Sequence, residues 1–197
     1  RYEFFFVILQ PMIFDNRFGA NSRIAGINVS WKTKDEAKVL LKSKWDNYNS
    51  NNIVIYDQNV AVSSLVSNAK IEDSINEAME REEFDYFFLS KYRFHNHALE
   101  LNFNDAGISN VLSIIYDETS VAPEDARITD LKNGIITPEK NGQRLMLSES
   151  HEMISNGLKL LSNKINIRTQ LITPMLTKND AEDLIDSARV VLDAPIT

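Results

Sequence analysis

The chain has 197 residues, 43% of them hydrophobic and 25% charged, which is typical of a soluble globular protein. It contains no cysteine, which excludes disulfides, thiol catalysis and cysteine-ligated zinc. The formal net charge is −7 and no basic stripe is visible, so we do not expect direct binding of duplex nucleic acid.

The N-terminal part of the chain predicts a strand–helix–strand arrangement. Residues 2–9, YEFFFVIL, predict a buried strand, because this apolar opening is too short to span a membrane. Residues 24–31 predict a second strand by their alternation, and Thr33 with Glu36 forms a capping-box pattern that begins a helix. A strand over 53–57 then completes the length of a βαβ unit with a parallel crossover in a mixed sheet.

The middle of the chain alternates between helical and extended patterns. Residues 60–67 fit a helix or a strand equally well, and 68–83 predict an amphipathic helix because apolar residues recur every four positions. The segment 84–104 is rich in aromatic and β-branched residues and predicts extended structure. Asn104 or Asp105 is a good N-cap for a further short helix.

The last third predicts hairpins followed by two helices. Asn-Gly pairs at 133–134 and 141–142 tolerate the positive φ of tight turns, so we expect an antiparallel hairpin region over 127–147. A helix over 148–163, a strand over 165–172 and a helix from Thr177 follow.

These elements predict an α/β or α+β protein with about five helices. We expect one compact domain over residues 1–197, with the possibility of a hairpin subdomain at 120–147.

Two of the three histidines lie one residue apart in a predicted strand. Because alternate side chains share a strand face, His95 and His97 point the same way and could hold one metal ion. A third ligand would be needed, and His151 is the remaining histidine, with Asp57 and Glu152 as carboxylate candidates. The alternative, which we favour, places the histidines at the entrance of a core strand with their polar edges hydrogen-bonded.

The motifs that would identify an enzyme are absent. There is no glycine-rich phosphate loop, no Gly-x-Ser-x-Gly elbow and no pair of histidines at helical spacing around a glutamate. The acidic stretch 123–132 lacks the spacing of a metal-dependent nuclease and fits solvated charge beside a hairpin. We therefore expect no catalytic residues and no cofactor.

Aromatic residues are concentrated in two segments. The stretch 85–94, DYFFLSKYRF, holds five aromatics, and a strand can bury only half of them in its own domain. The rest require another layer or another chain, and aromatic residues are enriched at interface hot spots. We expect interface contacts from five residues, with the last two as second choice: Phe87, Tyr92, Phe94, Phe4 and Phe6.

The sequence favours a non-enzymatic assembly or interaction protein that acts through protein–protein contacts, such as a structural subunit of a phage or viral particle. A protein partner or self-assembly is expected, without a membrane, in the cytoplasm or in a virion. Two alternatives stay open: a metal-dependent hydrolase or nuclease built on the histidines, and an acidic inhibitor or immunity-type protein that covers a basic partner.

Overall fold

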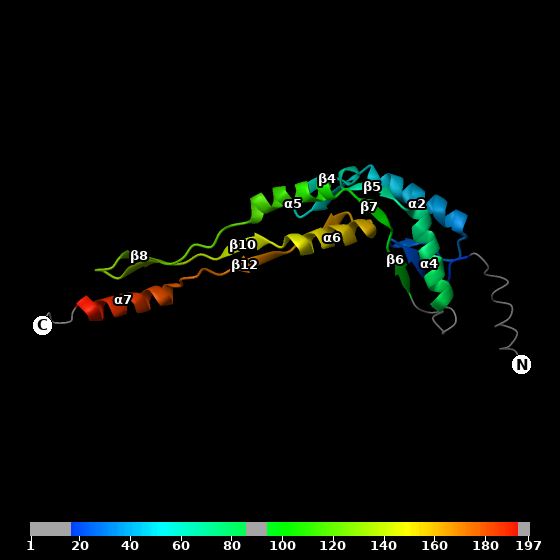
Figure 1. The fold of residues 1–197 in the computed structure, drawn as a ribbon. Helices are drawn as coiled ribbons and strands as arrows, with labels where there is room; N and C mark the ends of the chain where they lie inside the picture. The colour runs from blue at the N-terminus through cyan, green and yellow to red at the C-terminus, as the bar shows by residue number, and fades with distance from the viewer. Residues whose placement is uncertain (1–16, 86–93, 193–197) are drawn as a thin grey trace, which may run out of the picture. The chain divides into compact units, whose positions relative to one another are not determined.

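The computed structural model of the chain describes residues 17–85 and 94–192. Within them it is a mixed α/β protein with six helices and several small sheets, which confirms the predicted class (Figure 1). The chain divides into two compact units. Unit 1 comprises residues 1–111 and 151–166, and unit 2 comprises residues 112–150 and 167–197.

The capping box predicted at Thr33 is present and begins helix α2 (Lys34–Asn49) of unit 1. The Glu36 amide donates to Thr33 Oγ1 at 3.3 Å, and the Thr33 amide donates to Glu36 Oε2 at 2.9 Å. One stripe of the helix is buried, consisting of Ala37, Leu41, Trp45 and Tyr48. The predicted helix is therefore confirmed together with its cap.

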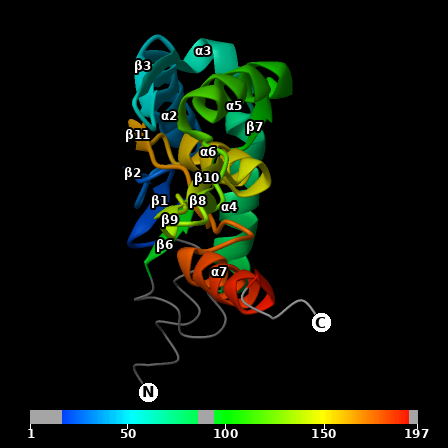
Figure 2. The same cartoon turned by 90° about the vertical axis from the view of Figure 1, so that its left-hand side faces the viewer.

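The described residues of unit 1 form two three-stranded sheets and one two-stranded sheet. Strand β1 (Ser22–Ile24) lies between β2 (Ile27–Asn28) and β6 (His95–His97), antiparallel to the first and parallel to the second (Figure 2). Strand β3 (Asn52–Ile55) lies between β11 (Lys164–Ile165) and β4 (Gln58–Ala61), and its pairing with β11 is parallel. Strand β5 (Val66–Ala69) pairs with β7 (Leu101–Phe103) in antiparallel fashion.

The βαβ prediction needs correction. The strands on either side of α2 are β2 and β3, and they belong to different sheets, so the run is no parallel βαβ unit. Strand β3 instead forms a hairpin with β4 across Tyr56 and Asp57, with Tyr56 at a φ of 56°. A hairpin connection needs only two residues, whereas a parallel crossover needs a dozen or more. Strand β4, which follows β3 directly in the chain, therefore pairs with it at low entropic cost.

The structure shows which elements residues 60–67 form, the segment for which the sequence fits helix and strand equally well. Residues 60–67 become the end of β4, the single-turn helix α3 (Val62–Leu65) and the start of β5. The amphipathic helix predicted over 68–83 is confirmed as α4 (Ile71–Asp85). Of the extended segment predicted over 84–104, residues 84 and 85 end α4, and the described residues 94–104 contain β6 and β7. The predicted strand at 2–9 lies outside the described residues.

Helices α5 (Asp105–Thr119) and α6 (Leu147–Lys159) contribute residues to both units. Asn104 caps α5, because its Oδ1 accepts from the Gly107 amide at 3.3 Å and its Nδ2 donates to the Ser64 carbonyl at 3.0 Å. The buried stripe of α5 consists of Ile108, Val111, Leu112 and Ile115. Both helices confirm the prediction.

Besides its parts of α5 and α6, the described part of unit 2 contains two ribbons of two strands and the helix α7. Strands β8 (Arg127–Asp130) and β9 (Ile135–Thr137) form the hairpin predicted at Asn133-Gly134, with Gly134 at a φ of 68°. Strands β10 (Gly142–Leu145) and β12 (Thr169–Ile172) form the other ribbon. Helix α7 (Lys178–Leu192) packs against β8 and β9.

The Asn-Gly pair at 141–142 does not form a hairpin turn, and here the turn prediction is wrong. Gly142 instead begins β10, where the neighbouring segment 121–123 passes very close to its backbone. A Cβ at this position would lie 2.5 Å from both the Pro123 nitrogen and the Val121 oxygen. The glycine is therefore required for close approach of two backbones.

In residues 17–85 and 94–192 no helix combines the length and the apolar character needed to cross a bilayer.

Replacing Gly107 tests whether α5 and α3 must approach each other closely. A Cβ at this position would lie 2.0 Å from the Ser64 carbonyl oxygen, so Gly107→Ala forces the two backbones apart. We expect the free energy of unfolding to fall by about 1–3 kcal/mol in urea titrations. Ser109→Ala, on the exposed face of the same helix, is the matched control and should leave the unfolding midpoint nearly unchanged.

Candidate functional site

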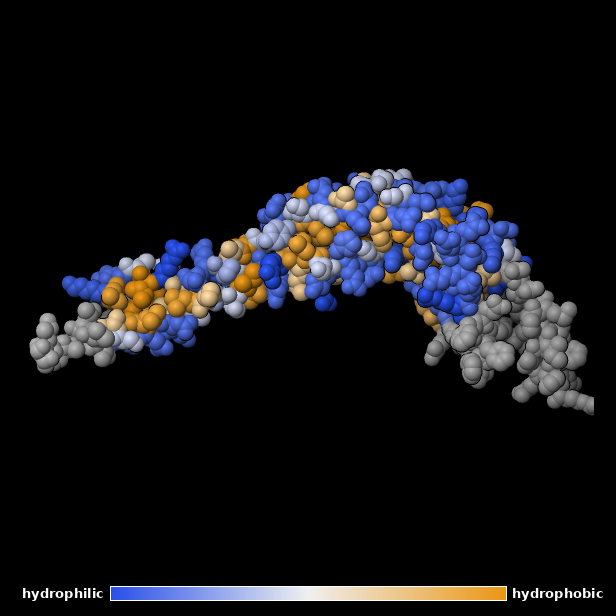
Figure 3. Space-filling model, in the orientation of Figure 1, coloured by the Kyte–Doolittle hydropathy of each residue, from blue (hydrophilic) through white to orange (hydrophobic). Residues whose placement is uncertain are grey.

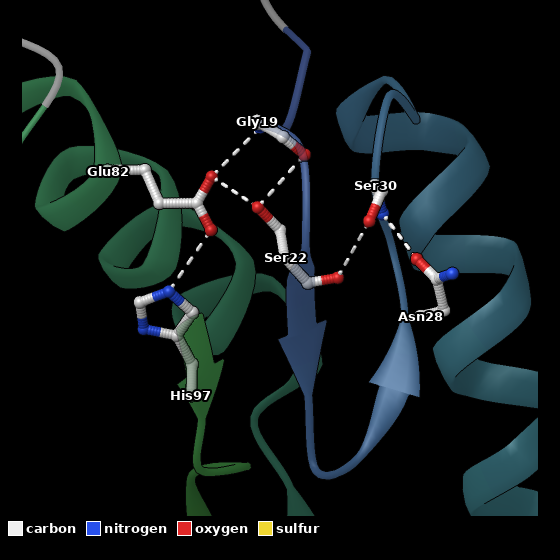
Figure 4. A network of polar contacts seen from close by, with 6 residues as sticks. All are labelled: Gly19, Ser22, Asn28, Ser30, Glu82 and His97. Carbon is white, nitrogen blue, oxygen red and sulfur yellow. Dashed lines mark hydrogen bonds and ion pairs between the residues drawn. The ribbon is translucent and has the colours of Figure 1, made fainter. Parts of the chain in front are cut away.

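A buried polar network joins β1, β6 and the C-terminal part of α4 (Figure 4). Ser22 is fully buried, and the side chains of Glu82 and His97 are only 10% and 12% exposed. Glu82 Oε2 accepts from the Ser22 hydroxyl at 2.8 Å and from the Gly19 amide at 3.0 Å. Glu82 Oε1 lies 3.2 Å from His97 Nε2.

The sheet register brings this network together. The parallel pairing of β1 with β6 sets Ile24 opposite His97, two residues from Ser22, and α4 packs against β1. Glu82 therefore reaches both strands from the helix that covers them. Ser30 extends the network, because its hydroxyl donates to the Ser22 carbonyl at 3.4 Å (Figure 4).

The pKa of Glu82 reflects two opposing effects. Burial raises the pKa of this carboxyl group, but the hydrogen bonds from His97, Gly19 and Ser22 and the charge of His97 lower it. The second group of effects is larger, so the pKa lies below its ordinary value of 4.5. Glu82 is therefore ionised at neutral pH and accepts hydrogen bonds only, which means that His97 Nε2 carries the proton in their bond.

The order of the groups excludes a Ser–His–acid hydrolase triad. In such a triad the imidazole is the immediate partner of the serine and takes its proton. Here the carboxylate stands between Ser22 and His97 and accepts from each through a different oxygen (Figure 4). The Gly19 carbonyl also lies 3.1 Å from Ser22 Oγ, so the single hydroxyl proton of Ser22 is shared between this carbonyl and Glu82 Oε2. The network acts as a clamp that fastens α4 to the sheet.

The three histidines proposed as metal ligands lie in different settings. The rings of His95 and His97 stack with centroids 6.1 Å apart and planes 6° apart, while His151 on α6 lies 3.8 Å from Asp105 Oδ1. In the part of the chain that the structure describes, no three His, Cys, Asp or Glu side chains gather as ligands of one ion. Asp57 is exposed in the β3–β4 turn.

Of the residues proposed for an interface, the structure describes Phe94. Its side chain is 62% exposed, and the guanidinium of Arg23 lies 5.1 Å above the ring centroid. This is a cation–π pair at the surface. Phe87, Tyr92, Phe4 and Phe6 lie outside the described residues.

Unit 2 exposes more large apolar side chains than it buries among the described residues. Its exposed ones are Ile114, Tyr116, Val121, Ile128, Leu131, Ile135, Leu147, Leu171, Met175 and Leu184. Its buried apolar ones are Leu112, Ile115, Ala126, Leu145, Ala181 and Ile185, two of which are alanines. In unit 1 the exposed ones are Trp31, Val39, Phe94 and Leu160.

The hairpin β8–β9 shows why unit 2 leaves apolar surface uncovered. Ile128 and Ile136 lie opposite each other on one face of the ribbon, and Ile135 points to the other face. Helix α7 packs on this ribbon, but one helix covers one face. Ile128 and Ile135 are both exposed, and apolar side chains gather over the α7 and β8–β9 segment (Figure 3).

Met175 lies in the loop that precedes α7 in the sequence, and hydrogen bonds fix the backbone of this loop. Asp125 Oδ1 accepts from the amides of Met175 and Leu176 at 2.7 and 3.1 Å, and the Ala126 amide donates to the Leu176 carbonyl at 2.9 Å. The Met175 side chain is nevertheless 94% exposed. We call Ile128, Leu131, Ile135, Met175 and Leu184 the apolar surface of unit 2.

Sequence reasoning missed this surface, although one signal was present. Ile135 and Ile136 are consecutive in a strand, so they point to opposite faces and one of them must leave the core of a hairpin with one covered face.

Comparison of the chain with protein-family models, curated proteins and solved structures finds no match.

The Glu82 clamp predicts a specific pH dependence of stability. Because the pKa of Glu82 is below 4.5 in the folded state, its contribution is complete above that value and is lost as the pH falls through the lowered value. Glu82→Gln should lower the free energy of unfolding at neutral pH by about 2–4 kcal/mol and by much less in acid.

Urea unfolding of both proteins from neutral pH into acid measures this difference. Glu80→Gln, on the exposed side of the same helix, is the control and should behave like the unmodified chain. A constant difference between Glu82→Gln and the unmodified chain at every pH would contradict the ionised clamp.

Proposed function

We propose that the chain is a non-enzymatic assembly protein that acts through protein–protein contacts, as a structural subunit of a larger particle such as a phage or viral particle would. The observation that supports this proposal is the apolar surface of unit 2. Exposed apolar patches of this kind are typical of interaction sites. Another protein chain is the natural cover, because it supplies the second layer that a two-stranded ribbon lacks.

The loop that carries Met175 supports the same proposal. A side chain that binds a partner contributes most when its backbone is already ordered, since little conformational entropy is then lost on binding. Asp125 and Thr177 fix the loop on either side, the latter through its amide, which donates to Asp180 Oδ2 at 2.9 Å. Methionine suits this role because its flexible side chain adapts to the pocket that receives it.

The free energy that burial of this apolar surface contributes to association can be compared with the cost of association. Fully burying a large apolar side chain contributes roughly 1.5–3 kcal/mol. The five residues of the apolar surface are on average about half exposed, so their burial contributes about 4–8 kcal/mol. Association costs about 4–15 kcal/mol in lost freedom. A stable complex therefore needs additional contacts beyond this surface.

The acidic-inhibitor and metal-hydrolase alternatives gain no comparable support. The buried carboxylate and imidazole of unit 1 satisfy each other, and the Ser22 hydroxyl proton is shared between Glu82 and Gly19, so the network presents no nucleophile to a substrate. By contrast, the exposed apolar side chains lie where solvent and partners reach them.

Replacing two residues of the apolar surface tests the proposal. Met175→Gln with Leu184→Gln keeps size and helix propensity but removes apolar area, so we expect concentration-dependent self-association to weaken in sedimentation velocity and light scattering. Thermal unfolding should stay nearly unchanged, because both side chains are exposed.

Val39→Gln is the matched control, since Val39 is an exposed apolar residue on α2 of unit 1. It should associate like the unmodified chain. The proposal is wrong for this surface if the double variant and the unmodified chain show the same mass at every concentration.

A further inference from the structure

Charge is distributed unevenly along the chain. Residues 17–36, which include β1 and β2, contain four Lys and Arg against Asp35 and Glu36, a net charge of +2, and Glu36 pairs with Arg17 at 3.9 Å. The described residues of unit 2 contain eleven Asp and Glu against seven Lys and Arg, a net charge of −4. Two parts of the chain therefore carry opposite charge, although the whole is acidic.

The basic part also carries exposed aromatic rings. Arg23 lies over Phe94 and donates to the Gly26 carbonyl at 3.3 Å, and Arg17 donates to the Trp31 carbonyl at 2.9 Å, with Glu36 Oε2 at 3.9 Å. These hydrogen bonds orient both guanidinium groups at the surface. We call Arg17, Arg23, Trp31, Lys32 and Phe94 the basic–aromatic surface. Arginine and tryptophan are among the residues most enriched at interface hot spots.

The acidic part coincides with the apolar surface of unit 2. Asp183 and Asp186 are exposed on α7 on either side of Leu184, and Glu182 is partly neutralised by Lys178 at 3.4 Å. Leu184 thus stands beside carboxylates at the surface. A partner that covers it must offer apolar or aromatic groups together with positive charge.

We infer that the partner is a second copy of this chain, whose basic–aromatic surface receives the acidic and apolar surface of unit 2 in a head-to-tail contact. This inference rests on the proposed function. Charge complementarity selects the pairing, because two unit 2 surfaces would set Asp183 and Asp186 against the same carboxylates. Guanidinium groups bind carboxylates in pairs of parallel hydrogen bonds and also stack on aromatic rings, so Arg23, which lies over Phe94, suits both halves of the contact.

The contact also meets the energetic requirement derived above. Phe94 and Trp31 add aromatic area to that of Met175 and Leu184, and the charged pairs add attraction that isolated apolar side chains lack. Since the two surfaces differ, a pair joined by one such contact retains one unused surface of each kind. Head-to-tail contacts of this type generate rings or filaments.

Two variants that each disable one surface test this inference. Asp183→Lys with Asp186→Lys reverses the acidic surface, and Arg23→Ala with Phe94→Ala truncates the basic–aromatic surface. Each alone should weaken self-association about tenfold or more in sedimentation equilibrium, and added salt should weaken association of the unmodified chain. Mixed together, the two variants should form a 1:1 complex that grows no further, because each retains the surface that the other lacks.

Controls separate a lost contact from a lost fold. Thermal unfolding of each variant should match that of the unmodified chain, and Asp46→Lys, at an exposed position of α2, should not change association. Association of the unmodified chain without a 1:1 complex of the mixed variants overturns the head-to-tail contact and leaves the proposed function standing. A monomer at every concentration overturns both. Binding of a single-stranded oligonucleotide through Arg23, without self-association, would assign the basic–aromatic surface to nucleic acid instead.

Discussion

A ribbon of two strands has two faces, and each face that carries apolar side chains must be covered by something other than water. In unit 2 the hairpin β8–β9 places Ile128 and Ile136 on one face and Ile135 on the other, while α7 is the helix that packs on it. Isolated two-stranded ribbons are marginally stable in water because they lack a third strand or a second layer. The demand for another layer is therefore a property of the architecture, and the exposure of Ile128 and Ile135 follows from it.

Unit 1 solves the same problem internally. Helix α4 packs against β1 of one three-stranded sheet, and α2, which packs against α4, buries the stripe of Ala37, Leu41, Trp45 and Tyr48. The buried carboxylate of Glu82 is compensated by three hydrogen-bond partners, so its charge does not require a ligand. His97, which the sequence offers as a metal ligand, is instead used for cohesion through its contact with Glu82.

The helices were predictable from the sequence because their signals are local. The Thr33–Glu36 capping box and the buried stripe of α5 act within a few residues, and both are present in the structure. Sheet pairing was less predictable, because several strands of the chain could pair with the same strand. In the structure β3 pairs with its neighbour β4 and with the distant β11. The Glu82 clamp could not be predicted, since it joins residues 15 and 60 positions apart.

The exposed surfaces differ from the core in how far sequence can describe them. Phe94 was proposed for contacts from the density of aromatics, and the structure adds that Arg23 lies over its ring, which turns an apolar residue into part of a cationic surface. Apolar area alone does not choose a partner, since it attracts any other apolar area. Charge provides the selectivity, because contact between two surfaces of like charge is unfavourable while contact between surfaces of opposite charge is favourable. A chain that carries both signs beside exposed rings and aliphatic side chains therefore contains within one sequence the selectivity that an assembling subunit requires.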